Sequence, residues 1–177
     1  MSETWPVSEE GTLRIKQNAV FDLKQLYKLF HTFAEENKYI FRETNFTRKD
    51  RSDGSEYQIE YELERKVTSF IKFKMTIEIW SLRTTEIKQE GKTLYKGELE
   101  MNFDANMEMD YATKTWKSGK LEEKSNWETN SFTKFLRNIY IYYLRKQYFL
   151  NYAGKLWEEL YELHAKTKAL LHQFTFF

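Results

Sequence analysis

The spacing of hydrophobic residues changes twice in the first forty positions. Leu13 and Ile15 alternate with Arg14 and Lys16, which predicts a short strand from about residue 12 to 20. A capping box, Asp22 followed three positions later by Gln25, then predicts the start of a helix that ends near residue 37. Its apolar residues recur at spacings of three and four, which gives one buried stripe: Leu23, Leu26, Tyr27, Phe30 and Phe33.

Alternation returns after residue 39 and predicts an antiparallel meander. Residues 39–49 and 57–64 flank a turn cluster at 50–54, which is typical of a hairpin, and residues 71–79 repeat the alternation before a turn at 90–92. The longest run covers residues 93–111, or about 63 Å at roughly 3.3 Å per residue, well beyond an ordinary strand. We therefore expect this strand to bend, at Gly97 or at a β-bulge.

The last third of the chain is helical in period. From residue 131 to 174 apolar residues keep alternating spacings of four and three, and this register survives Gly154. Such a helix would be about 64 Å long at 1.5 Å per residue, against a diameter of about 40 Å for a compact chain of this size. We expect it either to kink near Gly154 or to protrude.

These elements predict one α+β domain over residues 12–177, after a flexible lead-in over residues 1–11. Its antiparallel curved sheet should hold about five to seven strands, with a short N-terminal helix and a long C-terminal helix packed along the sheet. The order of elements over residues 12–174 resembles the helix-grip fold of START-like and polyketide-cyclase-like proteins. That resemblance implies a sheet wrapped around the last helix, often with an apolar ligand cavity. The C-terminal helix is also similar to segments of uncharacterised small archaeal or viral proteins.

Composition removes several classes of function. The 177 residues include no cysteine, which excludes disulfides, thiol nucleophiles and cysteine-ligated metals. The six glycines form no phosphate-binding loop, and the three histidines lack metal-ligand spacing, so we expect no cofactor, no metal and no catalytic residue. With no leader and no long apolar run, we expect a cytoplasmic protein without a transmembrane segment, or one within an intracellular or viral assembly.

Charge is balanced overall but uneven locally. The formal net charge is +1, which disfavours nucleic acid as a partner. Residues 132–155 combine basic and aromatic side chains without an acid, whereas residues 93–111 carry five acids that we place on a solvated strand face. Docking of the basic segment on this strand or on another protein chain is the favoured interpretation, and binding of nucleic acid or a membrane surface is the alternative. The predicted interface residues are Lys134, Arg137, Tyr140, Tyr143, Arg145, Lys146, Trp157 and Tyr161.

Two functional hypotheses follow. In the first, the protein is a non-catalytic assembly or interaction module, a homo-oligomer or part of a larger complex, because its long helix carries two apolar faces that one sheet does not readily bury. In the second, it is a helix-grip carrier of an apolar small ligand such as a lipid or an aromatic compound, with a filled core as the simpler alternative. The residues that would line that pocket are Phe73, Met75, Ile77, Met101, Phe103, Met107 and Met109.

Overall fold

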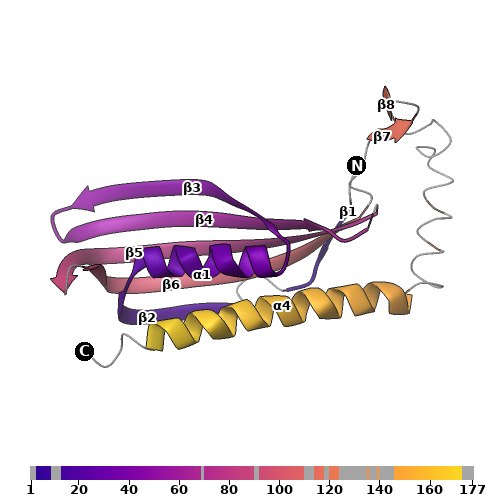
Figure 1. The fold of residues 1–177 in the computed structure, drawn as a ribbon. Helices are drawn as coiled ribbons and strands as arrows, with labels where there is room; N and C mark the ends of the chain where they lie inside the picture. Colours follow the sequence, from indigo (N-terminus) through magenta and orange to yellow (C-terminus); the bar gives the residue numbers. More distant parts are fainter. Residues whose placement is uncertain are drawn as a thin grey trace.

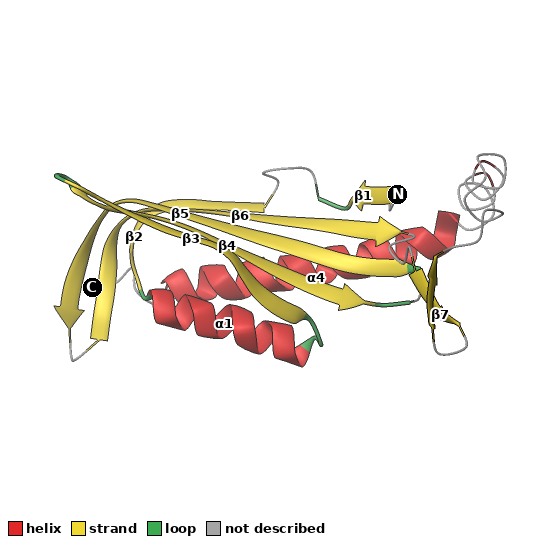
Figure 2. Ribbon diagram, turned by 90° about the horizontal axis from the view of Figure 1, so that it is seen from above, coloured by secondary structure: helices red, strands yellow, loops and turns green. Residues whose placement is uncertain are grey.

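The protein is an α+β structure in which two helices lie on one face of a curled, open, antiparallel sheet (Figures 1 and 2). A computed structural model describes residues 3–8, 13–68, 70–89, 92–109, 114–117, 120–123, 135, 139 and 146–172. The six-stranded sheet has the order β1-β6-β5-β4-β3, with β2 also paired to β6, and β7 and β8 form a separate hairpin. The elements are β1 (Glu3–Pro6), β2 (Leu13–Phe21), α1 (Leu23–Glu36), β3 (Ile40–Arg51), β4 (Gly54–Lys66), β5 (Ile71–Gln89), β6 (Lys92–Met109), β7 (Lys114–Lys117), β8 (Lys120–Glu123) and α4 (Lys146–His172).

The predicted fold class is confirmed at this level, with six strands in the main sheet and one helix at the C-terminal end. Residues 3–6, which we assigned to a lead-in, form strand β1 and pair with residues 106–109 of β6. Beyond β1, the Ser8 hydroxyl accepts a 2.7 Å hydrogen bond from the backbone N–H of Ala105. Ala105 lies between the part of β6 that pairs with β1 and the part that pairs with β2, so the Ser8 side chain provides the acceptor that a strand would provide elsewhere.

Helix α1 begins where the capping residue predicts. The carboxylate of Asp22 accepts hydrogen bonds from the backbone N–H groups of Lys24 and Gln25, at 2.8 and 3.3 Å. At the other end Lys38 has a φ of 59°, and the N–H of Tyr39 bonds the carbonyl of Ala34 at 2.7 Å. A left-handed residue therefore ends the helix, a conformation for which glycine is the usual choice.

The hairpin of β5 and β6 lies at the centre of the sheet, and it bends where the sequence analysis placed a bend. The pairing register shifts between Leu82 and Thr85, so that an extra residue of β5 is accommodated opposite Gly97. A Cβ at Gly97 would lie 2.8 Å from the carbonyl oxygen of Leu82, and Arg83 within the bulge has a φ of 51°. Beyond this point the ends of both strands turn away from the rest of the sheet (Figure 2). Gly97 and a bulge act together here, rather than as alternatives.

Helix α4 packs along the inner face of the sheet, the face that also carries α1 (Figure 1). It is helical through Gly154, and a methyl group at that position would meet only open space, so no break occurs there. The predicted start of this helix at residue 131 lies outside the described residues. Its side chains that are at most 3% exposed meet the inner face of β6 and β2: Phe149, Leu156, Leu160, Leu163, Thr167 and Leu171. The first five follow the predicted stripe, whereas Leu171 is buried where the predicted spacing gave Leu170, which is only partly buried.

Candidate functional site

A hollow of about 530 Å³ lies on the outer face of the sheet, away from the helices. We call it the Trp80 hollow, because Trp80 and Leu82 lie on its central strand, β5, and are 40% and 43% exposed. Its volume is in the range of small-ligand sites. All five long strands contribute to the lining, which consists of Lys16, Gln17, Asn18, Thr47, Lys49, Glu56, Tyr57, Gln58, Trp80, Leu82, Glu98, Leu99 and Glu100.

The hollow arises where the alternation of β5 reverses. Up to Ile79 the inner positions of this strand are apolar and the outer positions are polar. At the next three residues the outer positions hold Trp80 and Leu82, while the inner position holds Ser81, which is fully buried and bonds the Thr84 hydroxyl at 2.5 Å. Since successive strand residues point to opposite faces, this inversion places a large apolar pair on the outer face.

Strand register determines what surrounds this pair. Trp80 lies between Gln58 of β4 and Glu100 of β6, and Leu82 lies opposite Glu98. Asn18 of β2 pairs with Glu98 on the far side. Gln58 and Asn18 are both exposed, and neither side chain makes a hydrogen bond with a residue that the structure describes. Two free amides, each a donor and an acceptor, therefore flank the apolar centre.

Each acid that β6 contributes to the hollow has a basic partner. Glu100 binds the guanidinium of Arg14 and lies 3.4 Å from the ammonium of Lys16, and its hydrogen bond with Arg14 lowers its pKa. Glu98 pairs with Arg83. The negative charge contributed by β6 is therefore neutralised by neighbouring bases.

The remaining acid and the remaining base of the hollow behave differently. The carboxylate of Glu56 lies 2.9 Å from the guanidinium of Arg51. Lys49 is opposite Glu56 in the pairing register, but it is exposed and forms no ion pair with any acid in the described parts of the chain. Lys49 is thus the charged group of the hollow that is free to meet a ligand.

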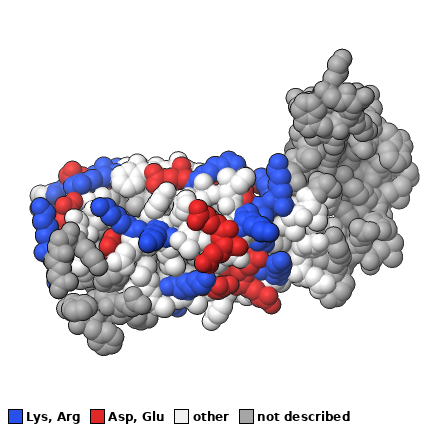
Figure 3. Space-filling view, in the orientation of Figure 1, with Lys and Arg blue, Asp and Glu red and all other residues white. Residues whose placement is uncertain are grey.

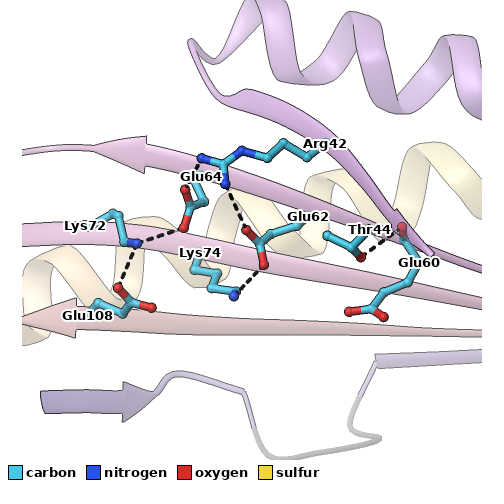
Figure 4. Close-up of polar contacts among 8 residues, drawn as sticks. All are labelled: Arg42, Thr44, Glu60, Glu62, Glu64, Lys72, Lys74 and Glu108. Carbon is cyan, nitrogen blue, oxygen red and sulfur yellow. Dashed lines mark hydrogen bonds and ion pairs between the residues drawn. The ribbon is translucent and has the colours of Figure 1, made fainter. Parts of the chain in front are cut away.

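The other half of the outer face is an ion-pair network (Figure 4). Lys72 lies 2.7 Å from Glu64 and 2.8 Å from Glu108, and Lys74 lies 2.5 Å from Glu62. A guanidinium completes it, because Arg42 bonds Glu64 at 2.7 Å. The hydrogen bond with Lys72 lowers the pKa of Glu64. These charged groups satisfy one another, in contrast to the exposed apolar pair further along β5.

A polar cluster inside the molecule joins three elements. Arg65 of β4 places one guanidinium nitrogen 2.8 Å from both carboxylate oxygens of Glu159 on α4, and another 2.7 Å from the carbonyl of Asn37. The Tyr39 hydroxyl donates to the same carboxylate at 2.6 Å, while burial and this hydrogen bond raise the pKa of Tyr39. Every strong contact of the cluster is internal, so it positions α4 rather than forming an open site.

A second, smaller hollow of about 240 Å³ lies between β2 and the last turns of α4, lined by Arg14, Ile15, Lys16, Gln17, Lys168 and Leu171. Nearby, His164 is buried against the ring of Phe103, at 5.4 Å between centroids, and burial lowers its pKa. Its Nε2 atom has no hydrogen-bond partner among the described residues. We treat this histidine as a core residue, because it is 6% exposed and its ring packs against the buried Phe103.

The predicted pocket residues are brought together, in the core. All seven face the helices and are at most 7% exposed, and none of them lines either of the two hollows: Phe73, Met75, Ile77, Met101, Phe103, Met107 and Met109. Helix α4 fills the space above them, with Tyr152 packed 6.3 Å from Phe73 and His164 against Phe103. Among the described residues this layer is closely packed.

The predicted interface residues are less fully placed. Tyr161 is exposed on α4 and Trp157 is partly buried against the core. Lys146 opens α4, but its side chain lies outside the described part of the structure. The others also fall outside it: Lys134, Arg137, Tyr140, Tyr143 and Arg145.

Trp80 and Leu82 were not predicted as site residues from the sequence. The available signal was their position. Every second residue from 72 to 78 is polar, and Trp80 and Leu82 occupy the next two positions of that alternation with large apolar side chains.

On the side of the molecule that carries the helices, basic side chains border the acidic ones without a large region of one sign (Figure 3). This mixture agrees with the near-neutral total charge.

Comparisons with known proteins add no family. No protein-family model matches the chain, and no curated protein sequence matches it. The resemblance to helix-grip proteins therefore stays a prediction.

Across the described residues, no acidic or histidine cluster suited to a metal ion occurs. Within the same residues, neither helix has the length and apolar content needed to cross a membrane.

Proposed function

We propose that this protein is a non-catalytic binding module whose ligand occupies the Trp80 hollow on the outer face of the sheet. The observation that carries the proposal is the inverted alternation of β5, which exposes Trp80 and Leu82 at the centre of a concave surface. Full burial of a large apolar side chain is worth roughly 1.5–3 kcal/mol, and Trp80 and Leu82, which are 40% and 43% exposed, each forgo somewhat less than half of this. A ligand that covers them recovers part of this free energy.

The surroundings of the pair support a specific site. In the ion-pair network of the outer face the charged side chains pair with one another, as Lys72 does with Glu64 and Glu108. In the hollow, the amides of Asn18 and Gln58 remain available beside an apolar surface. An apolar surface with a few polar groups around it is the usual composition of a ligand site.

Interior packing favours this hollow over the carrier hypothesis. A carrier of helix-grip type needs room between the sheet and its last helix, yet Met75, Met101 and Phe103 are fully buried there. The apolar ligand class proposed for a carrier can instead be tested at the outer hollow.

The test uses N-phenyl-1-naphthylamine, an uncharged aromatic probe whose fluorescence rises in apolar surroundings. We expect the full chain to bind it, and Trp80→Ala to weaken that binding about tenfold, since roughly 1.4 kcal/mol of contact is lost. Tyr161→Ala is the matched control, because it removes an exposed aromatic side chain from α4 on the other side of the sheet. Equal binding by wild type and Trp80→Ala would disprove the proposal.

Assembly through α4 is a second candidate function. Leu150, Gly154 and Tyr161 follow one another at helical spacing and are all exposed, with open space around Gly154. An exposed apolar strip of this kind is a common contact surface between helices. This candidate retains the homo-oligomer or larger assembly expected from the sequence.

Light scattering after size-exclusion chromatography tests that candidate. We expect an oligomer that Tyr161→Glu converts to a monomer, with unchanged circular dichroism. Lys155→Glu is the control, since Lys155 is exposed on the same helix but lies about 100–140° around the helix from the three residues of the exposed strip. A wild-type monomer at high micromolar concentration would contradict assembly through α4. Truncation before Leu156 is unsuitable, because it removes part of the core.

A further inference from the structure

The charges of the Trp80 hollow restrict its ligand, and this inference rests on the proposed function. Two lysines and three glutamates line the hollow. Ion pairs neutralise all three glutamates: Glu56 with Arg51, Glu98 with Arg83, and Glu100 with Arg14 and Lys16. Lys49 alone among these lining groups has no partner in the described structure.

The bases that neutralise these acids change the sign of the net charge around the hollow. The lining residues alone carry three acids against two bases. Adding the three paired arginines gives five bases against three acids for the lining residues and their ion-pair partners. The next outer-face acids, Glu60 and Glu78, lie beyond Gln58 and Trp80 on the side away from Lys49, so the surplus base is at the Lys49 end of the hollow. An anionic group is therefore attracted, whereas a cationic one is repelled.

Strand spacing fixes the distance between the apolar centre and the free charge. Trp80 and Leu82 lie on β5, and Lys49 lies on β3, two strands away. Adjacent strands are about 4.8 Å apart, so the two features are separated by roughly 10 Å, part of which the flexible lysine side chain spans. A ligand of one or two fused rings with an acid group at its end covers this distance.

We propose that the Trp80 hollow binds a small amphipathic organic anion, with an apolar or aromatic body on Trp80 and Leu82 and an acid group on Lys49. The amides of Asn18 and Gln58 flank the body of the ligand and supply hydrogen bonds to any polar substituent. The occupant is a single free molecule rather than a membrane or a second copy of the chain, because the hollow matches the volume of one small ligand.

The experiment compares two probes that share one aromatic body. 8-Anilinonaphthalene-1-sulfonate carries an acid group, whereas N-phenyl-1-naphthylamine lacks it. Both are titrated against the full-length protein and against Trp80→Ala, Lys49→Gln and Lys24→Gln at low and moderate salt. Lys24 is an exposed lysine of α1 and serves as the control for loss of a positive charge.

We expect the sulfonate to bind with one-to-one stoichiometry and more tightly than the neutral probe. Lys49→Gln should weaken the sulfonate about three- to fivefold, the size of an exposed ion pair, and leave the neutral probe unchanged. Lys24→Gln should change neither probe, and Trp80→Ala should weaken both. Added salt should reduce only the affinity for the sulfonate.

Different failures separate the two proposals. If Trp80→Ala changes neither affinity, the hollow is not the binding site and the proposed function fails with it. If Trp80→Ala weakens both probes but Lys49→Gln weakens neither, the site stands and the anionic class of ligand is wrong. If light scattering shows that Trp80→Ala dissociates an oligomer, the occupant is a second copy of this chain, which also overturns the inference.

Discussion

The guanidinium of Arg65 on β4 lies 2.8 Å from both carboxylate oxygens of Glu159 on α4, 94 residues further along the chain. Both side chains are largely buried, at 16% and 11% exposure. The same guanidinium lies over the ring of Tyr39, 4.4 Å from its centroid. The pair therefore links α4 directly to β4 on the inner face of the sheet, beside the apolar contacts of the core.

Removing the charge of Glu159 should destabilise the fold strongly. Glu159→Gln leaves the Arg65 guanidinium without a counter-ion in a largely buried position, and we expect the free energy of unfolding to fall by about 3 kcal/mol. Urea denaturation followed by circular dichroism measures this change. Glu158→Gln, at the exposed neighbouring position, should change stability by less than about 0.5 kcal/mol. Equal effects of the two variants would show that the pair does not stabilise α4.

Two glycines should respond to alanine in opposite directions. Gly97→Ala places a methyl group 2.8 Å from the carbonyl oxygen of Leu82 and 3.0 Å from Thr84, so we expect a loss of about 1–3 kcal/mol. Gly154→Ala adds a methyl group in open space on a helix and should gain about 1 kcal/mol. Thermal denaturation of both variants tests the pair. A stabilising Gly97→Ala would mean that the bend of β5 and β6 is not constrained at this residue.

Acid should destabilise the protein in two steps. Burial lowers the pKa of His164. At pH values below the ordinary histidine pKa of about 6.5, this histidine is therefore protonated in the unfolded chain to a greater extent than in the folded chain. Stability should therefore fall as the pH drops from about 7 to 5. Ion-pair contacts lower the pKa values of Glu64 and Glu100, so a further loss begins near the ordinary glutamate value of 4.5 and continues at lower pH.

His164→Gln isolates the first step, because glutamine stays neutral over this range. We expect its free energy of unfolding to be flat between about pH 7 and 5, whatever its absolute value, while the later acid step remains. His31→Gln on α1 is the control, since it removes the other histidine whose side chain the structure describes, with 45% of that side chain exposed. Urea denaturation at a series of pH values gives both slopes. An unchanged slope in His164→Gln would show that another group causes the first step.

Most of the fold followed from local patterns. Asp22 marked the start of α1, and the alternation around Tyr61 and Phe103 marked the strands, because each pattern reflects contacts with one buried face. The bend was predictable from the length of β6 and the position of Gly97. The pairing of residues 3–6 with β6 was not predictable, since four residues around Pro6 carry no periodic signal.

The candidate site was harder to predict than the fold. Trp80 and Leu82 follow directly after the apolar residues that β5 buries, and a hydrophobic pair there is usually part of a core. Only the parity relative to Ile79 shows that they point outward. Whether Lys49 has an ion-pair partner depends on which bases its neighbouring acids bind. In the folded sheet Arg51 forms the ion pair with Glu56, which leaves Lys49 without this partner. Such pairings depend on register between strands, which a single sequence does not specify.

The most direct test of the proposed site is the response of Trp80 itself to a ligand. The indole N–H groups of the five tryptophans give separate signals in a ¹⁵N correlation spectrum, and Trp80→Phe assigns one of them. On titration with 8-anilinonaphthalene-1-sulfonate, we predict that the Trp80 signal shifts in proportion to occupancy while the signal of Trp157, on α4, does not. A shift of Trp157 with an unmoved Trp80 would contradict a binding site on the outer face and return the ligand to the interior.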